Sequence, residues 1–173
     1  SFRLRETLAN HLDAITTYPD REYTSLRKCI ANYVSTDYNN VLVGNGSSEL
    51  ISLFIQLNHP KKALIVGPTY SEYEREVSLG GGRTHYFRLP ENDNFRLCPE
   101  KLIEELSHNV DLLILCNPNN PTGSVVVRED MYTILDYCKQ KDITVLVDET
   151  YIEFAENTKP KGSCLKVEKS FWY

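Results

Sequence analysis

Four short polar segments carry most of the residue types that could bind a ligand or take part in chemistry. They are residues 44–49, 67–70, 117–123 and 148–151, with the sequences GNGSSE, GPTY, NPNNPTG and DETY. Each segment follows an apolar run that is typical of a buried strand. Open α/β sheets bind ligands at the carboxyl edge of their strands, so we expect the four segments to converge there.

The segment NPNNPTG is the stiffest of the four. Pro118 and Pro121 each fix φ and remove a backbone donor, so neither a helix nor a strand can continue through it. The segment therefore holds three asparagine amides, including that of Asn120, in a rigid loop just past a strand. A strand-ending turn rich in turn formers is the alternative explanation for any single Asn-Pro pair.

The segment GNGSSE has the composition of a phosphate cradle. Its glycines allow sharp backbone turns, and Ser47 and Ser48 then begin an expected helix. Free N–H groups and the helix dipole favour an anion at such a helix start. The segment matches neither a Walker loop nor the dinucleotide-binding glycine pattern. The alternative is an ordinary serine N-cap, with Glu49 supporting the first turn.

Tyr70 and Asp148 add an aromatic plate and a carboxylate at the same expected edge. The Tyr70 ring could lie flat on the aromatic plane of a ligand, although a plain core or surface tyrosine is the alternative in a chain with 11 tyrosines. Asp148 directly follows a five-residue apolar run, so we expect it to be partly buried and to need a partner. A helix cap or a surface acid is the alternative for Asp148.

Helices and strands must alternate along the chain to place these segments. The expected helices span 2–16, 23–34, 50–57, 71–79, 99–106 and 129–139. The expected strands span 41–43, 63–66, 84–89, 112–116 and 143–147, with 84–89 on the outer part of the sheet. This alternation predicts an α/β fold, a three-layer α/β/α arrangement with a mainly parallel sheet and right-handed crossovers.

The composition limits the class of protein. A chain of 173 residues with 41% hydrophobic and 25% charged residues should be globular and soluble. The net charge of −5 argues against a general nucleic-acid or anionic-membrane surface. No segment approaches the roughly 20 apolar residues of a membrane span, and the N-terminus lacks the residue order of a secretory signal.

The cysteines and histidines suggest neither a metal site nor a hydrolase. The five cysteines are odd in number and scattered, which favours reduced thiols in the cytoplasm. A catalytic thiol is the alternative, but buried free cysteine is the commoner role. The four histidines do not cluster, and we find no zinc or serine-hydrolase constellation.

In this order and at roughly these gaps, the four segments resemble the class I/II aminotransferases of fold type I, which use pyridoxal 5′-phosphate (PLP). Within that family the resemblance is closest to the branch of histidinol-phosphate aminotransferases and threonine-phosphate decarboxylases. It extends from Tyr18 to about Phe154, which is most of the chain.

The resemblance implies a role for each residue around the PLP ring. Asp148 should pair with the protonated pyridine nitrogen, which keeps the ring an electron sink. Asn120 and the Tyr151 hydroxyl should hydrogen-bond the phenolic oxygen of the ring, and Tyr70 should stack on its face.

The resemblance also implies how the phosphate is held and how subunits share the site. The backbone N–H groups of Ser47 and Ser48 should bind the 5′-phosphate. Tyr18 should reach the phosphate in the neighbouring subunit of a homodimer.

Three family features have no counterpart in the 173 residues: the lysine that binds PLP covalently, in a Ser-x-Lys segment, the arginine that binds the substrate carboxylate, and an N-terminal Asn-Pro arm. The resemblance therefore assigns no catalytic residue and no metal ligand here. We expect 1–21 to be an N-terminal helix and interface turn, 22–157 a partial PLP-binding large domain and 158–173 a truncated tail. We expect such a chain not to complete transamination alone.

Three functions remain open at this point, beside the alternative of a regulatory fragment that binds no ligand. The first is PLP-dependent amino-group transfer between an amino acid and a 2-oxo acid. The second is PLP-dependent decarboxylation of a phosphorylated amino acid. The third is a non-catalytic α/β module that binds a phosphate ligand, which would need only the Gly-Ser-Ser cradle and would leave Asp148 and Asn120 unexplained. The first two imply a small-molecule amino-acid substrate, with no nucleic acid or membrane as partner.

Overall fold

The computed structural model describes residues 3–155 of the chain, and a four-stranded parallel sheet forms its centre. The strands lie in the order β2-β1-β3-β4. Their bounds are Lys62–Gly67 for β1, Arg83–Arg88 for β2, Leu112–Cys116 for β3 and Thr144–Asp148 for β4. The expected position of residues 84–89 on the outer part of the sheet is confirmed, since β2 is an edge strand.

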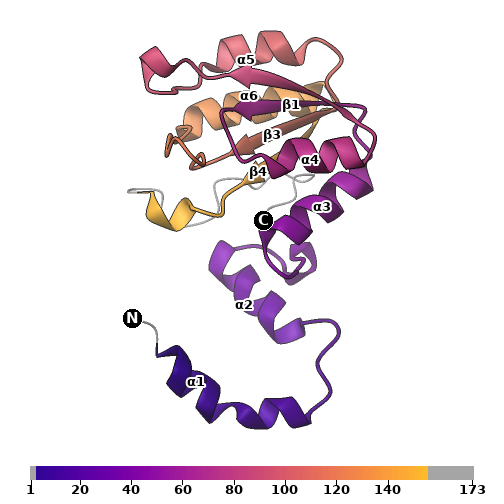
Figure 1. Ribbon diagram of the computed structural model, residues 1–173, viewed down its shortest axis with the longest axis vertical. Helices are drawn as coiled ribbons and strands as arrows, with labels where there is room; N and C mark the ends of the chain where they lie inside the picture. Colours follow the sequence, from indigo (N-terminus) through magenta and orange to yellow (C-terminus); the bar gives the residue numbers. More distant parts are fainter. Residues whose placement is uncertain (1–2, 156–173) are drawn as a thin grey trace.

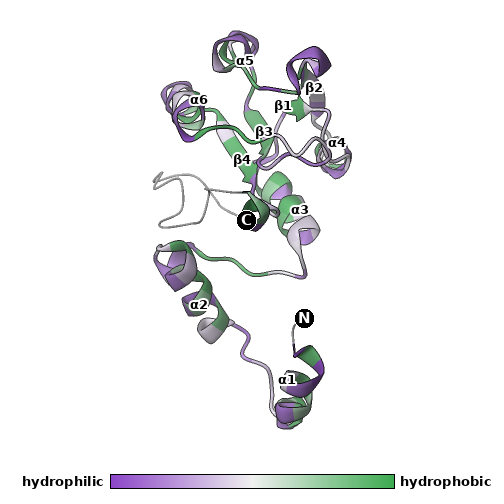
Figure 2. Cartoon of the chain, turned by 90° about the vertical axis from the view of Figure 1, so that its left-hand side faces the viewer, coloured by the Kyte–Doolittle hydropathy of each residue, from purple (hydrophilic) through white to green (hydrophobic). Residues whose placement is uncertain are grey.

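Helices cover both faces of this sheet (Figures 1 and 2). The α-helices are α1 Leu4–Asn10, α2 Thr24–Val34, α3 Ser47–Asn58, α4 Glu72–Leu79, α5 Pro99–Leu106 and α6 Arg128–Gln140. Short 3₁₀ helices span Leu12–Thr16, Tyr38–Asn40, Glu91–Asp93 and Ile152–Phe154. α3 and α4 pack on one face of the sheet, and α5 and α6 pack on the other. The predicted three-layer α/β/α fold is confirmed.

Two hydrophobic cores meet at β3, whose five residues are all buried. Because successive strand side chains point to opposite faces, Leu113 and Leu115 join the core under α5 and α6. Leu112 and Ile114 join the core under α3 and α4. A strand buried on both faces reads as a continuous apolar run, as it does in this sequence.

The strand order creates a switch point between β1 and β3. From β1 the chain continues to β2 on one side, whereas from β3 it continues to β4 on the other. In open α/β sheets such a point leaves a crevice at the carboxyl ends of the two strands. The segments 67–70 and 117–123 follow these two strand ends.

The α3 helix brings the Gly-Ser-Ser segment to the same edge. It ends at Asn58, four residues before β1 begins at Lys62, so its carboxyl end lies at the amino edge of the sheet. At about 1.5 Å per residue its 12 residues span roughly 18 Å, which is close to the length of a six-residue strand. Its first residue, Ser47, therefore lies at the end of the helix that points away from the amino edge.

The N-terminal arm, residues 3–40, stands apart from the sheet in Figure 1. The helix expected over 2–16 is interrupted: α1 ends at Asn10, and a 3₁₀ helix follows over Leu12–Thr16. The apolar residues of this segment are largely uncovered by the described chain, since Leu4, Leu8, Leu12 and Ile15 are 58–83% exposed. A short helix without such packing is marginal, which accounts for the break.

The strand expected over 41–43 is wrong. Val41 has extended dihedral angles, φ −107° and ψ 123°, but this segment does not join the sheet. The Arg27 side chain instead satisfies the backbone, because its Nε donates to the Val41 carbonyl at 2.8 Å. The boundary of β4 also differs from the expectation, since Asp148 is its last residue. The expected tail 158–173 lies outside the described residues.

Within the described residues 3–155, no helix combines the length and the hydrophobicity that a membrane span needs.

Candidate functional site

The loop after β3 is held in place by two of its asparagines. The Asn117 backbone N–H donates to the Asp148 carbonyl at 2.8 Å, and the Asn117 Oδ1 accepts the Val126 N–H at 2.9 Å. The Asn119 Nδ2 donates to the Pro68 carbonyl at 2.9 Å, which ties the β3 loop to the β1 loop. Both side chains are buried, and these hydrogen bonds hold the loop in shape.

Asn120 differs from its neighbours. It is half-buried, and within residues 3–155 its side-chain amide has no hydrogen-bond partner. It shares an open cleft of about 320 Å³ with Tyr151, which comes from the segment after β4. The structure therefore brings together these two residues, which the family resemblance assigns to one oxygen of the cofactor ring.

Asp148 is buried at the carboxyl end of β4, with 6% of its surface exposed. Its Oδ2 accepts a hydrogen bond from the Tyr73 hydroxyl at 2.6 Å. Its Oδ1 accepts from the Thr150 N–H at 2.9 Å and from the Thr150 hydroxyl at 2.6 Å. The expectation that Asp148 is buried and partnered is confirmed, and the surface-acid alternative does not hold.

These partners leave Asp148 incompletely satisfied. A carboxylate offers about four acceptor positions, and the three donors fill three of them. No lysine, arginine or histidine of the described range 3–155 pairs with its charge. A buried, uncompensated carboxylate with a vacant acceptor position fits a protonated ring nitrogen.

Tyr73, which the sequence reasoning missed, connects Asp148 to Tyr70. Its side chain is fully buried in α4. Its ring meets the Tyr70 ring edge to face, with centroids 5.6 Å apart and planes at 83°. The available signal was its place with Val77 on the inward face of the helix, because a buried tyrosine hydroxyl needs a partner.

Neither Ser47 nor Ser48 caps the start of α3 with its side chain. Gly46 is the N-cap residue, with φ 92° and ψ 170°, and it makes no side-chain cap. The Glu49 Oε2 accepts the Asn45 N–H at 2.5 Å, so the glutamate rather than a serine holds the preceding turn. Among the described residues, the hydroxyls of Ser47 and Ser48 have no hydrogen-bond partner. The expected phosphate cradle is thus available to an anion.

Tyr18 does not join the other candidate residues within one chain. It lies in the N-terminal arm with 77% of its surface exposed, and the Arg21 Nη2 donates to its hydroxyl at 2.7 Å. Figure 1 shows this arm away from the sheet edge. A role for Tyr18 in the neighbouring subunit stays a prediction.

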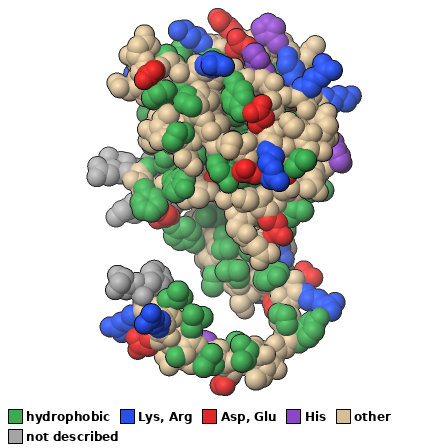
Figure 3. Space-filling model, in the orientation of Figure 1, with side chains coloured by type: hydrophobic (Ala, Val, Ile, Leu, Met, Phe, Trp, Pro, Cys, Tyr) green, Lys and Arg blue, Asp and Glu red, His purple; other side chains and the backbone are tan. Residues whose placement is uncertain are grey.

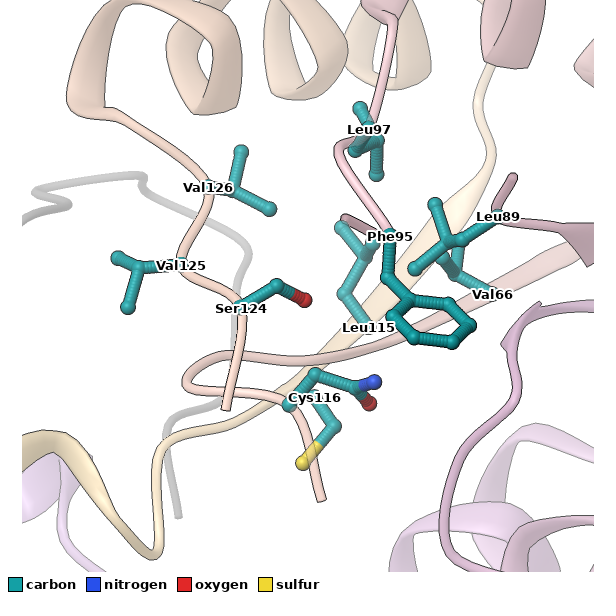
Figure 4. A pocket seen from close by; sticks show the side chains of 10 residues that line it. Val66, Leu89, Phe95, Leu97, Leu115, Cys116, Ser124, Val125 and Val126 are labelled. Carbon is teal, nitrogen blue, oxygen red and sulfur yellow. The ribbon is translucent and has the colours of Figure 1, made fainter. Parts of the chain in front are cut away.

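A second, smaller cavity lies behind the β3 loop (Figure 4). Its lining is mainly apolar, with Phe95, Leu97 and Leu115 converging on it. These residues belong to the core under α5 and α6, on the other face of the sheet from Tyr73. We therefore interpret it as a gap in that core rather than as the reactive site.

Burial sets the acid–base properties around this edge. Burial, followed by the negative charge of Asp148, raises the pKa of Glu149 to about 7. Burial also raises the pKa of the Cys116 thiol, which disfavours the thiolate that a catalytic cysteine needs. Within residues 3–155, no group of His, Cys, Asp and Glu side chains could hold a metal ion.

Curated relatives match most of this chain. It is 43% identical over 155 residues to a putative threonine-phosphate decarboxylase of Caldanaerobacter subterraneus subsp. tengcongensis, covering 90% of the chain and 42% of the relative. It is 38% identical over 144 residues to a histidinol-phosphate aminotransferase of Clostridium kluyveri, covering 82% and 40%. The chain thus spans less than half the length of these relatives.

Solved structures show the same fold. The histidinol-phosphate aminotransferase from Clostridium acetobutylicum superposes with a TM-score of 0.78 at 32% identity, covering 90% of this chain and 45% of that one. The L-threonine-O-3-phosphate decarboxylase from Porphyromonas gingivalis gives a TM-score of 0.73 at 27% identity, with coverages of 88% and 44%.

The family described as aminotransferase class I and II matches residues 3–172, almost the whole chain. Members of this family depend on PLP, and the environments of Asp148, Asn120 and Tyr151 described above fit that cofactor. The chain therefore belongs to the class I and II aminotransferase family of PLP-dependent enzymes.

Proposed function

We propose that this chain forms the cofactor-holding part of a PLP-dependent enzyme that acts on a small amino compound. The observation that carries the proposal is the environment of Asp148. Its carboxylate is buried, accepts hydrogen bonds from Tyr73 and Thr150, and has no cationic partner within residues 3–155. A protonated pyridine nitrogen would supply both the missing donor and the missing positive charge.

Bound PLP supplies an electron sink for the α-carbon of the substrate. Asp148 holds the proton on the ring nitrogen, which maintains that property. Tyr70 covers one face of the ring, and its own orientation is supported by the edge of Tyr73. Asn120 and Tyr151, which line one cleft, hydrogen-bond the phenolic oxygen.

The proposal also covers the binding of the PLP 5′-phosphate and the assembly of the chain into a homodimer. The N–H groups of Ser47 and Ser48, at the start of α3, bind the 5′-phosphate. Tyr18 contributes from the partner subunit of a homodimer, because within its own chain it lies away from the sheet edge. We place the enzyme in the cytoplasm, consistent with the free thiols of Cys29 and Cys98.

Amino-group transfer between an amino acid and a 2-oxo acid is the reaction we propose first. The family and the histidinol-phosphate aminotransferase relatives support it. Decarboxylation of threonine phosphate is the second candidate, because a relative at 43% identity carries that putative activity. Both relatives are named for phosphorylated substrates, so we expect a phosphate on the substrate as well.

Product analysis separates these reactions. The protein, in the full length in which its gene encodes it, is loaded with PLP and given either histidinol phosphate with a 2-oxo acid, or threonine phosphate alone. Amino-group transfer predicts a new amino acid from the 2-oxo acid, in equal amount to the substrate consumed. Decarboxylation predicts one CO2 per threonine phosphate consumed, with no 2-oxo acid required.

Asp148→Ala tests the proposal against the non-catalytic alternative. We expect the variant to lose most of its affinity for PLP, measured by absorbance titration of the cofactor-free protein. Tyr86→Phe is a control that should keep the PLP affinity of the wild type. The Tyr86 hydroxyl, on the edge strand β2, donates to Glu74 and lies away from the loops after β3 and β4. Unchanged binding of PLP and inorganic phosphate in Asp148→Ala, together with no turnover of either substrate, would support a phosphate-binding module instead.

A further inference from the structure

Asp148 is held by two separate elements. Thr150, in the segment after β4, donates twice to Oδ1, whereas the Tyr73 hydroxyl from α4 is the donor to Oδ2. The Thr150 contacts are local, because the two residues are neighbours in the chain. The Tyr73 contact spans 75 residues of sequence and fixes the carboxylate relative to a different layer of the fold.

The hydroxyl of Tyr73 is not explained by packing. Its ring is fully buried among apolar residues of α3, α4 and the sheet, where phenylalanine would bury the same ring without a polar group. A buried hydroxyl is costly unless it is hydrogen-bonded, and this one donates at 2.6 Å to the carboxylate assigned to the cofactor nitrogen. Burial, followed by the charge of Asp148, raises the pKa of Tyr73, so the group stays protonated and acts as a donor.

The same ring touches the second group assigned to the cofactor. Tyr73 contacts the Tyr70 ring edge to face and the Asp148 carboxylate through its hydroxyl, so it links the two side chains. One side chain thus supports both the group that covers the ring face and the group that binds the ring nitrogen.

We propose that Tyr73 is a positioning residue for the cofactor, and this rests on the function proposed above. Its hydroxyl holds the Asp148 carboxylate in one orientation, so that the carboxylate can accept the proton-bearing nitrogen of the PLP ring as a hydrogen-bond donor. The donor is fully buried and lies 2.6 Å from Oδ2, so the contact restricts the orientation of the carboxylate.

The test compares two single-atom deletions. Tyr73→Phe removes the hydroxyl that reaches Asp148, and Tyr86→Phe removes one that donates to Glu74 at 3.1 Å. Each variant keeps its ring, and near-ultraviolet circular dichroism checks that each is folded. PLP affinity is measured on the cofactor-free protein in the full length in which its gene encodes it. We expect Tyr73→Phe to bind PLP on the order of ten-fold more weakly than the wild type, and Tyr86→Phe to bind PLP as tightly as the wild type.

A PLP analogue with carbon in place of the ring nitrogen, 1-deaza-PLP, isolates the mechanism. It offers no proton to Asp148, so Tyr73→Phe should bind it as tightly as the wild type does. The Asp148→Asn background should likewise abolish the effect of Tyr73→Phe on PLP binding, which a double-mutant cycle measures.

The outcomes separate the two proposals. Equal losses for PLP and the analogue, or no loss for either, would overturn the positioning role of Tyr73 while leaving the proposed function intact. A wild-type protein that does not bind PLP would overturn the proposed function itself.

Discussion

The carboxylates of Asp148 and Glu149 are adjacent in the chain but lie in different environments. Asp148 accepts hydrogen bonds from Tyr73 and Thr150. Within residues 3–155, no donor reaches the Glu149 carboxylate. Burial and the neighbouring charge of Asp148 raise the pKa of Glu149 to about 7, whereas no such burial acts on a glutamate in the unfolded chain.

Glu149 should therefore make stability fall as the pH rises. The folded state binds more protons than the unfolded state between the ordinary glutamate pKa of 4.5 and about 7, so the free energy of unfolding decreases as the pH rises across that window. Glu149→Gln removes the ionisation, and at pH 8 the variant should be more stable by up to about 3 kcal/mol. Urea unfolding at pH 5 and pH 8 measures the difference.

Glu104→Gln is the matched control for this experiment. Glu104 is exposed on α5, so its replacement should leave the pH dependence of the wild type unchanged. If Glu149→Gln kept the same decrease in stability between pH 5 and pH 8 as the wild type, the assignment to Glu149 would be wrong.

At the scale of elements, the start of α3 depends on one glycine. Gly46 has φ 92° and ψ 170°, a region that is essentially restricted to glycine. A Cβ atom added there would meet no atom within 4 Å, so the cost of a side chain is conformational rather than steric. This conformation turns the chain into the helix that presents the N–H groups of Ser47 and Ser48.

Gly46→Ala should destabilise the protein by about 1–3 kcal/mol and weaken its binding of PLP. Gly80→Ala is the control, because Gly80 has φ −74° at the end of α4 and an added Cβ would meet its neighbours at 3.5 Å or more. Urea unfolding compares the two variants. Equal stabilities would contradict the argument that the Gly46 conformation excludes side chains.

The β3 strand supports the loop that carries Asn120. Leu113, in the middle of β3, is fully buried, so Leu113→Ala should cost about 2–5 kcal/mol in the free energy of unfolding. Leu57→Ala removes the same atoms from a side chain that is 78% exposed on α3, and it should change stability by about 0.5 kcal/mol or less. Comparable losses in both variants, measured by urea unfolding, would contradict this placement of the core.

At the scale of the molecule, the N-terminal arm exposes an apolar surface (Figure 3). Leu4, Leu8, Leu12 and Ile15 are 58–83% exposed along it. Contiguous exposed apolar surface of this kind marks an interaction site, and the proposed homodimer would cover it. Tyr33 of α2 hydrogen-bonds Glu153 in the 3₁₀ helix after β4, so the arm is connected to the segment that carries Tyr151.

Ile15→Glu should weaken the dimer, because it places a charge in the surface that we expect the partner to cover. Sedimentation equilibrium should give a dimer mass for the wild type and a shift towards the monomer for the variant. Tyr132→Glu is the control, because Tyr132 is exposed on α6, on the far face of the sheet. A wild-type monomer, or dimers of equal strength in both variants, would contradict the proposed assembly.

Local patterns in the sequence were sufficient to predict the three layers and the outer position of the strand over 84–89, but not the contacts between distant segments. The strands after 62 and their flanking helices follow directly from apolar runs and helical periodicity. The expected strand 41–43 failed because a strand needs a ladder partner, and Arg27 took that carbonyl instead. Tyr73 escaped notice because its partner, Asp148, is 75 residues away and nothing local marks the pair.

The ring nitrogen of bound PLP provides the most direct test of the account. Nuclear magnetic resonance of PLP labelled with ¹⁵N at that position reports whether the nitrogen carries a proton. We predict a protonated nitrogen at pH 8 in the wild-type protein and loss of that proton in Asp148→Ala. A bound cofactor whose nitrogen is unprotonated in the wild type, or is protonated equally in both proteins, would contradict the central claim that Asp148 holds it.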